Sequence, residues 1–203
     1  MNMNVLVMCE YSGVVRNAFR RKGHMAWSCD LLPSDDGSKF HHEHDCLEVM
    51  RTKQVRISHW DLIIMHPPCT ALAVSGNRWY GKGMAKHHER IASIEWTMNL
   101  FNEAKKYAPY VCMENPVGVL PVKPTQYIQP WEFGHGETKK TGLWLHNLPK
   151  LTPTDVVEGR EQRVWKMGPS PDRWKLRSKT YQGIADAMAE QWDIDNLVIL
   201  LKD

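Results

Sequence analysis

The sequence predicts an α/β protein whose strands are buried on both faces and lie largely parallel to one another. Apolar runs without turn residues, at 5–8, 62–65 and 110–113, have the composition of such strands. Segments of helical periodicity lie between them, the clearest at 88–107. Because ligands of open α/β sheets bind at the carboxyl edge of the strands, we expect the functional site where these runs end.

Composition and cysteine usage favour one globular domain without membrane contact. The chain has 203 residues, of which 42% are hydrophobic and 24% are charged, as in ordinary globular proteins. It contains no apolar run approaching the roughly 18 residues of a membrane span, and no N-terminal signal pattern. Its five cysteines are spread singly, without a C-x-x-C pair, which is typical of reduced thiols. We therefore expect a single domain, 1–203, located in the cytoplasm.

Charged residues are unevenly distributed, although the formal net charge is only +3. Acidic residues dominate 30–48, whereas basic residues dominate 160–179. We expect the acidic segment to suit a cationic or hydroxyl-rich ligand and the basic segment to suit a phosphate backbone.

The first strand opens a strand-turn-helix-strand unit. The turn 9–13 precedes a helix that starts at Val14 and ends at Gly23, and a second strand, Met25–Cys29, ends at Asp30. Small residues before a helix suit a polar or anionic ligand group, and an acid after the second strand suits the two hydroxyls of a ribose. The glycines do not follow G-x-G-x-x-G, so a dinucleotide site is not supported.

The segment 33–44 predicts a polar loop followed by a short helix around Val49. Residues of metal-ligating type gather at the end of this loop: His41, His42, His44, Asp45 and Cys46. They are adjacent rather than spaced to wrap one ion, so a solvated loop is favoured and we expect no metal.

Cys69 stands at the most informative strand end. The run before it stops at Pro67-Pro68, because proline interrupts both strands and helices. A cysteine here is either an inert buried thiol or a nucleophile, and its place after a strand favours the nucleophile. The glycine-rich segment 70–83 that follows predicts a mobile loop, of the length used for active-site lids.

Glu114 ends the strand 110–113, beyond the helix that follows the Cys69 loop. Neighbouring parallel strands lie roughly 4.8 Å apart, so Cys69 and Glu114 can face one pocket. A thiol beside a carboxyl group fits addition to an electron-poor ring that the acid activates by hydrogen bonding. The alternatives for Glu114 are a helix N-cap and an exposed loop acid.

The C-terminal third is less regular. A strand is predicted at 141–145, a helix at 181–192 and a final strand at 197–201. Between them, 160–180 joins basic residues to Trp165 and Trp174. This composition fits phosphate contact with base stacking, and it equally fits a solvated loop held by two tryptophans.

Taken together, Pro67-Pro68-Cys69-Thr70 and Glu114-Asn115 resemble the motifs of DNA (cytosine-5) methyltransferases. Pro68-Cys69-Thr70 matches the family's Pro-Cys-Gln motif, and Glu114-Asn115-Pro116 matches Glu-Asn-Val. The turn 9–13 lies at the place of the first cofactor motif. The resemblance covers nearly the whole chain and is greatest to compact, phage-encoded members linked to restriction-modification. It implies a Rossmann-like S-adenosylmethionine-dependent methyltransferase sheet with helices on both faces, in a bacterial host cell.

The resemblance also implies the activity and the roles of residues. The reaction would be methyl transfer from S-adenosylmethionine to C5 of cytosine in DNA, through a covalent bond between Cys69 and C6. Glu114 would hold the N3 and amino edge of the base, and Lys139 or Lys140 would hold O2. The implied cofactor-binding residues are Ser12, Gly13, Asp30, Asp45, Pro67 and Thr180. The expected nucleic-acid contacts are Ser75, Gly76 and Arg78 in the loop that closes over a flipped base, and Arg163, Lys166, Arg173 and Lys175.

Methylation of an exocyclic amine is disfavoured, because His66 and Cys69 stand where that chemistry has an acidic or amide group and an aromatic ring. Two departures from the cytosine-5 pattern bear on cofactor and substrate. Tyr11 replaces the first motif glycine, which predicts a changed cofactor pose or identity. Only 146–176, an irregular basic segment, stands in place of a recognition domain. The DNA sequence recognised would therefore be short or loosely defined, or its recognition would be supplied by a second copy or another partner. A cytosine mononucleotide as substrate, and a catalytically silent nucleic-acid-binding protein, remain the alternatives.

Overall fold

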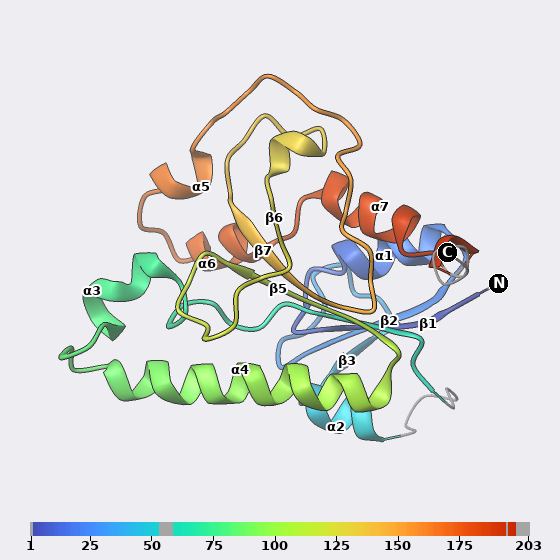
Figure 1. Cartoon of the computed structure of the whole chain (residues 1–203), viewed down its shortest axis with the longest axis horizontal. Helices are drawn as coiled ribbons and strands as arrows, with labels where there is room; N and C mark the ends of the chain where they lie inside the picture. Colours follow the sequence, from blue (N-terminus) through green and yellow to red (C-terminus); the bar gives the residue numbers. More distant parts are fainter. Residues whose placement is uncertain (1, 53–58, 194, 198–203) are drawn as a thin grey trace.

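The computed structural model describes residues 2–52, 59–193 and 195–197, which form one twisted sheet with helices on both faces (Figure 1). The strand order is β3-β2-β1-β4-β5-β7-β6. The strands from β3 to β5 in this order run parallel, and β7 runs antiparallel to both of its neighbours. The strands are β1 (Asn4–Met8), β2 (Met25–Asp30), β3 (His41–Glu43), β4 (Leu62–Met65), β5 (Tyr110–Pro116), β6 (Gln126–Ile128) and β7 (Thr141–His146).

Two groups of helices cover the sheet. The helices are α1 (Val14–Arg21), α2 (Cys46–Arg51), α3 (Asn77–Tyr80), α4 (His87–Tyr107), α5 (Arg163–Lys166), α6 (Arg173–Ser178) and α7 (Gln182–Gln191), with short 3₁₀ turns η1 (Val74–Gly76) and η2 (Pro130–Glu132). In Figure 1, α1 and α7 lie together on one face, and α2 and α4 lie on the other. The predicted α/β fold is therefore confirmed.

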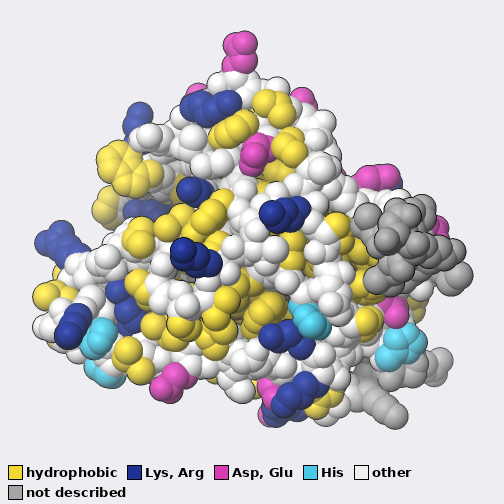
Figure 2. Space-filling model, in the orientation of Figure 1, with side chains coloured by type: hydrophobic (Ala, Val, Ile, Leu, Met, Phe, Trp, Pro, Cys, Tyr) yellow, Lys and Arg dark blue, Asp and Glu magenta, His cyan; other side chains and the backbone are white. Residues whose placement is uncertain are grey.

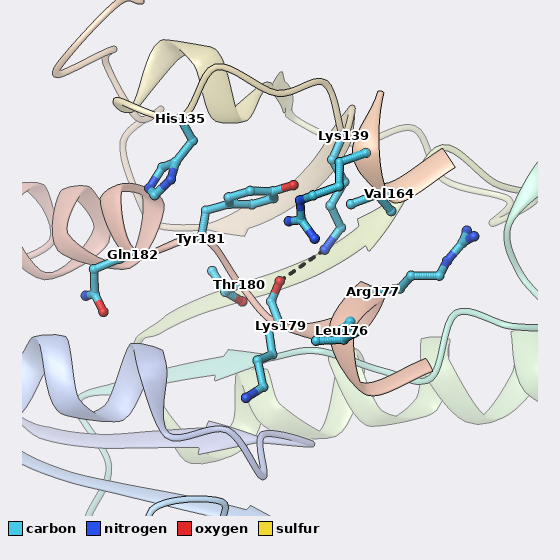
Figure 3. A pocket seen from close by; sticks show the side chains of 10 residues that line it. His135, Lys139, Val164, Leu176, Arg177, Lys179, Thr180, Tyr181 and Gln182 are labelled. Atoms are coloured by element: carbon cyan, nitrogen blue, oxygen red, sulfur yellow. Dashed lines mark hydrogen bonds between the residues drawn. The ribbon is translucent and has the colours of Figure 1, made fainter. Parts of the chain in front are cut away.

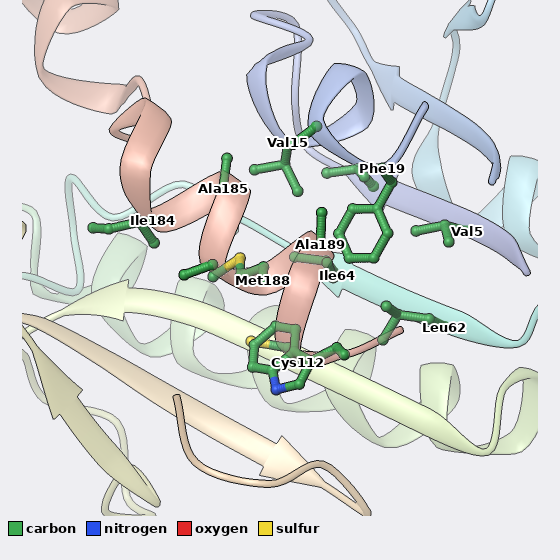
Figure 4. Packing of buried hydrophobic residues seen from close by; sticks show 14 of the residues in the cluster. Val5, Val15, Phe19, Leu62, Ile64, Cys112, Ile184, Ala185, Met188 and Ala189 are labelled. Atoms are coloured by element: carbon green, nitrogen blue, oxygen red, sulfur yellow. The ribbon is translucent and has the colours of Figure 1, made fainter. Parts of the chain in front are cut away.

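Both faces of strand β1 are buried, which explains why its sequence is continuously apolar. Val5 and Val7 belong to the hydrophobic core beneath α1 and α7 (Figure 4), whereas Leu6 and Met8 belong to the core beneath α2 and α4. Successive side chains of a strand point to opposite faces, so a strand with helices on both sides has no polar face. The strand β4 alternates between the same two cores.

Several predicted segments differ from the structure in detail. The polar loop 33–44 contains the edge strand β3, because backbone pairing with β2 needs no apolar pattern at a sheet edge. The loop 70–83 is partly helical, since η1 and α3 lie in it. Within the predicted apolar stripe of α4, Ile91 is 44% exposed. Of the predicted strand 197–201, only Leu197 is described, and its N–H donates to the carbonyl of Asp193 in a helical pattern.

No helix in the described ranges is long and apolar enough to cross a membrane.

Replacing Ile64 by alanine tests the central strand. Ile64 is fully buried between β1 and β5, so its truncation leaves a cavity as well as losing buried apolar area. We expect the free energy of unfolding to fall by about 2–5 kcal/mol in urea titrations. The matched control, Ile91→Ala on the exposed side of α4, is expected to change it by less than about 0.5 kcal/mol. Equal losses in the two variants would contradict this assignment of the core.

Candidate active site

A large cavity, with a volume of about 910 Å³, opens at the carboxyl edge of the parallel strands. Its walls come from the turns after β1, β2 and β4, from the last residues of β5, from α3, and from the segment that contains α6. This is the edge at which the sequence predicts a site. The predicted site residues that line the cavity are Ser12, Asp30, Pro67, Cys69, Ser75, Gly76, Glu114, Lys139, Arg173 and Thr180.

Cys69 is held in a tight turn directly after β4. Its carbonyl accepts hydrogen bonds from the N–H groups of Leu72 and Ala73. The preceding proline pair is tied to β5, because the buried side chain of Asn115 donates to the carbonyl of Pro67 at 3.0 Å. The asparagine of the Glu114-Asn115 pair thus positions the backbone that carries the cysteine.

The ionisation of Cys69 depends on two sets of neighbours. Burial and the negative charge of Glu114 raise the pKa of the Cys69 thiol, while the positive charges of Lys139 and Arg177 oppose this shift. The thiol is consequently protonated at neutral pH while Glu114 is charged. Two cations are nevertheless in place to stabilise a thiolate once that negative charge is offset.

Glu114 reaches the same cavity from the next strand. The register of β4 with β5 pairs Met65 with Met113, so His66 and Glu114 stand side by side, with Nδ1 of His66 3.4 Å from Oε2 of Glu114. Burial would raise the pKa of Glu114, but the hydrogen bond from His66 and the charge of Lys139 hold it below its usual value. Glu114 is therefore an ionised carboxylate in a largely buried setting.

Only one of the two candidate lysines reaches the cavity. Nζ of Lys139 donates to the carbonyl of Lys179 at 3.3 Å and lies 5.8 Å from the ring centroid of Tyr181 (Figure 3). Lys140 lies over the ring of Tyr127 and does not line the cavity. Neighbouring side chains of an extended segment point in opposite directions, which explains why the two lysines separate.

A smaller pocket of about 260 Å³ adjoins the main cavity and shares Lys139, Arg177 and Thr180 with it (Figure 3). Arg163 lines this side pocket and is paired with Glu137 at 2.9 Å. The hydroxyl of Tyr181 donates to the other oxygen of Glu137 at 2.7 Å. Glu137 therefore joins the predicted basic segment to the start of α7.

The turn after β1 is built around buried charges. The carboxylate of Glu10 accepts hydrogen bonds from the N–H groups of Val15 and Arg16 at 2.7 and 3.2 Å, so it stabilises the N-terminus of α1. Gly13 adopts a positive φ of 70°, and a Cβ there would lie 2.2 Å from the guanidinium of Arg16. Gly13 thus shapes the turn without lining the cavity, whereas Ser12 lines it.

The two acids predicted to bind the cofactor occupy different places. Asp30 lines the cavity at the end of β2, where burial raises its pKa, and its Oδ1 accepts from the N–H of Leu32 at 3.0 Å. Asp45 does not line the cavity. Its carboxylate accepts from the N–H groups of Leu47 and Glu48 and caps α2.

The basic segment folds back over the cavity. The hydroxyl of Tyr11 donates to the carbonyl of Lys175 at 3.0 Å and lies 2.9 Å from Oγ of Ser178, and its ring packs against Trp174. The segment that the sequence predicts to be irregular thus forms a roof that contains α6. Arg173, Trp174, Arg177 and Ser178 line the cavity from this roof.

The loop after Cys69 forms the opposite wall. The buried guanidinium of Arg90 on α4 donates to the carbonyl of Ala71 at 2.7 Å and to Oδ1 of Asn77 at 2.8 Å. Ser75 and Gly76 line the cavity, while Arg78 is exposed and lies over the ring of Trp79. Of the basic residues predicted to bind nucleic acid, Lys166 and Lys175 do not line the cavity either.

Sequence reasoning missed several side chains of the site. Tyr11, Trp79 and Arg177 line the cavity, and His66 contacts Glu114. A signal existed for His66, which directly precedes the two prolines on the same strand end. The others could not be assigned, because their segments lack the periodicity that relates a sequence to a fold.

In the parts of the chain that the structure describes, no group of three or more His, Cys, Asp and Glu side chains is arranged to hold a metal ion. In the predicted histidine cluster, His42 stacks on Trp27, and Nε2 of His41 lies 2.9 Å from the carbonyl of Leu32.

Replacing Tyr11 by phenylalanine tests how the roof is held. The change removes the hydroxyl that contacts α6 while keeping the ring against Trp174. We expect tryptic cleavage within 163–179 to accelerate about fivefold, which corresponds to the loss of about 1 kcal/mol. The control is Tyr107→Phe, an exposed tyrosine at the end of α4, which is expected to leave cleavage unchanged. Identical cleavage rates for the two variants would show that the Tyr11 hydroxyl does not hold α6.

The chain was compared with known proteins. No family model matches the sequence, and no curated protein matches it. Among solved structures, the fold is similar to that of a candidate DNA modification methyltransferase encoded within an E. coli prophage. The TM-score is 0.52 and the sequences are 10% identical, over 83% of this chain and 56% of that one. The chain thus spans little more than half the length of this structural neighbour, and at this identity the similarity establishes the fold.

Proposed function

We propose that this protein transfers a methyl group from S-adenosylmethionine to C5 of cytosine in DNA, with Cys69 as the nucleophile. The observation that supports this most is the convergence of a thiol, an ionised carboxylate and a lysine in one cavity at the carboxyl edge of the sheet. The fold shared with a candidate DNA modification methyltransferase supports methyl transfer in general.

The chemistry of cytosine accounts for these three groups. C5 of cytosine is a poor nucleophile until a thiolate adds at C6, which is the role of Cys69. Glu114 accepts hydrogen bonds from the amino group and the N3 edge, and so holds the ring and offsets the charge that develops in it. Lys139 donates to O2, whereas Lys140 points to another side of the molecule.

The electrostatics of the site favour activation of the thiol only when the base is in place. The carboxylate of Glu114 raises the pKa of Cys69 while the cavity holds water. A base bound to Glu114 offsets this negative charge, and the charges of Lys139 and Arg177 then favour the thiolate. This arrangement limits reaction of the thiol with other electrophiles.

The first half of the sheet provides the groups that S-adenosylmethionine requires. Asp30 has one carboxylate oxygen bonded to the backbone of Leu32, which leaves the other for ribose hydroxyls. Ser12 and Pro67 line the same cavity as Asp30, and Thr180 lines it from the segment after α6. When bound, this cofactor would supply an electrophilic methyl group. The Tyr11 hydroxyl is committed to α6, so its ring acts as a wall of the site.

Aromatic and basic side chains at the cavity support a nucleic-acid substrate. Trp79 on α3 and Trp174 on α6 line the cavity while 59% and 49% exposed. Figure 2 shows Lys and Arg side chains interspersed with apolar ones over the end of the molecule that carries α3, α5 and α6. Exposed aromatic rings stack on bases, and the cations attract phosphates.

A cytosine mononucleotide is the second candidate substrate. The observation that favours it is the side pocket beside the main cavity, because Lys139, Arg163 and Arg177 line it and their positive charges would attract a phosphate. A longer strand would instead extend along Trp79 and Trp174.

Transfer assays with labelled S-adenosylmethionine separate these possibilities. We expect label to enter duplex or single-stranded DNA, with dCMP unlabelled, and Cys69→Ser to lose activity by about a thousandfold or more. The matched control is Cys112→Ala, a buried cysteine outside the cavity. Label in dCMP alone would favour the mononucleotide. Absence of transfer with salt-sensitive DNA binding intact would favour a catalytically silent binding protein.

The exposed tryptophans are tested by fluorescence anisotropy with labelled DNA at fixed salt. Trp174→Ala and Trp79→Ala each remove a stacking surface, so we expect Kd to rise at least about fivefold, or about 1 kcal/mol. Trp165→Ala is the control, because Trp165 is 74% exposed but does not line the cavity. Equal effects at Trp165 and Trp174 would mean that bases do not stack at the cavity.

A further inference from the structure

His66 is a largely buried side chain in the wall of the cavity. It follows β4 directly, lines the cavity, and has a side chain that is only 10% exposed. Nδ1 of its ring faces Oε2 of Glu114 at 3.4 Å. Nε2 is buried and has no hydrogen-bond partner among the described residues. A buried polar atom without a partner is unfavourable, so its retention calls for a role.

Two carboxylates lie around His66. Glu114 approaches from β5 and Glu10 from the turn after β1, and both carboxylates are largely buried. Burial raises the pKa of Glu10, and the charge of His66 opposes that rise. The other charged or titratable groups on the elements around this pair include Arg16 on α1, Lys139 before β7, Cys112 on β5 and Cys69 on the segment of His66 itself. The contact between Nδ1 of His66 and Glu114 is where a proton can pass between the two side chains.

We propose that His66 holds the proton that N3 of the base takes up when Cys69 adds to the ring, and that this proton passes through Glu114. The inference rests on the proposed function and extends it, because an ionised Glu114 has no proton of its own to give. His66 acts through Glu114 and is therefore a positioning residue.

The proton balance starts when the bound base has offset the charge of Glu114 and the Cys69 thiol has given its proton to water. The site then holds a thiolate, a carboxylate and a His66 ring that carries a proton on both nitrogens. The sulfur of Cys69 forms a bond to C6, and the displaced electron pair of the ring moves to N3. N3 takes a proton from Glu114, which takes the Nδ1 proton of His66, so the pair ends as a carboxylate and a neutral imidazole. After C5 has gained its methyl group, the C5 proton leaves to water and the C6–S bond breaks, with its electron pair returning to sulfur. The N3 proton then returns through Glu114 to His66.

The test compares His66→Asn with the wild type in the DNA transfer assay over a range of pH. An asparagine amide can still donate to Glu114, but it cannot release a proton at these pH values. We expect kcat to fall about a hundredfold with KM nearly unchanged, as for loss of general acid–base catalysis. The wild-type rate is expected to pass through a maximum with pH, because the step needs both an ionised Cys69 and a proton on the His66–Glu114 pair. The fall on the alkaline side of this maximum is expected to be absent from His66→Asn.

His42→Asn is the matched control, because His42 also has a buried Nε2 without a partner but stacks on Trp27 outside the cavity. It is expected to keep the wild-type rate and pH profile. A His66→Asn protein with wild-type rate and an unchanged profile overturns the role of His66 while leaving the proposed function intact. If that variant does not fold, the wild-type profile decides, since a rate that only rises with pH overturns the proposal. A wild-type protein that transfers no methyl group to DNA overturns both.

Discussion

The parallel pairing of β4 with β5 is the constraint on which the candidate site depends. Met65 opposite Met113 sets the register, so His66, which follows β4, and Glu114, which lies further along β5, stand at the same edge of the parallel strands. The side chain of Asn115 then joins β5 to the carbonyl of Pro67. A shift of one residue would turn Glu114 toward the opposite face, because side chains alternate along a strand. The distance between Cys69 and the carboxylate is thus fixed by backbone hydrogen bonds and by the two buried cores.

The charged side chains of the cavity act on one another across different strands and segments. Glu114 is held ionised by His66 and Lys139, although burial alone would favour its neutral form. The same carboxylate opposes ionisation of Cys69, which Lys139 and Arg177 favour. The ionisation of the Cys69 thiol therefore depends on whether the charge of Glu114 is offset.

The roof over the cavity is held by a few polar contacts. Tyr11 holds α6 from the turn after β1, and Glu137 holds Arg163 and Tyr181 from the segment before β7. The roof therefore depends on the same turns that build the cavity. Because α6 contributes Arg177 and Trp174 to the walls, a molecule bound in the cavity would contact α6 directly.

The sequence by itself determined the buried strands, the long helix α4 and the position of Cys69 in the segment after β4. It placed Glu114 just beyond a strand, whereas β5 continues through Glu114 to Pro116 because this part of the strand pairs with β7. These features follow from local patterns, namely apolar runs, helical periodicity and prolines that stop a strand. The tertiary structure alone decided which lysine faces the thiol, that Arg177 from α6 lies near it, and that His66 pairs with Glu114. It also decided that Asp45 caps α2 instead of lining the cavity. These contacts join residues that are distant in the chain or lie in segments without periodicity, so only the packing of the sheet and its roof defines them.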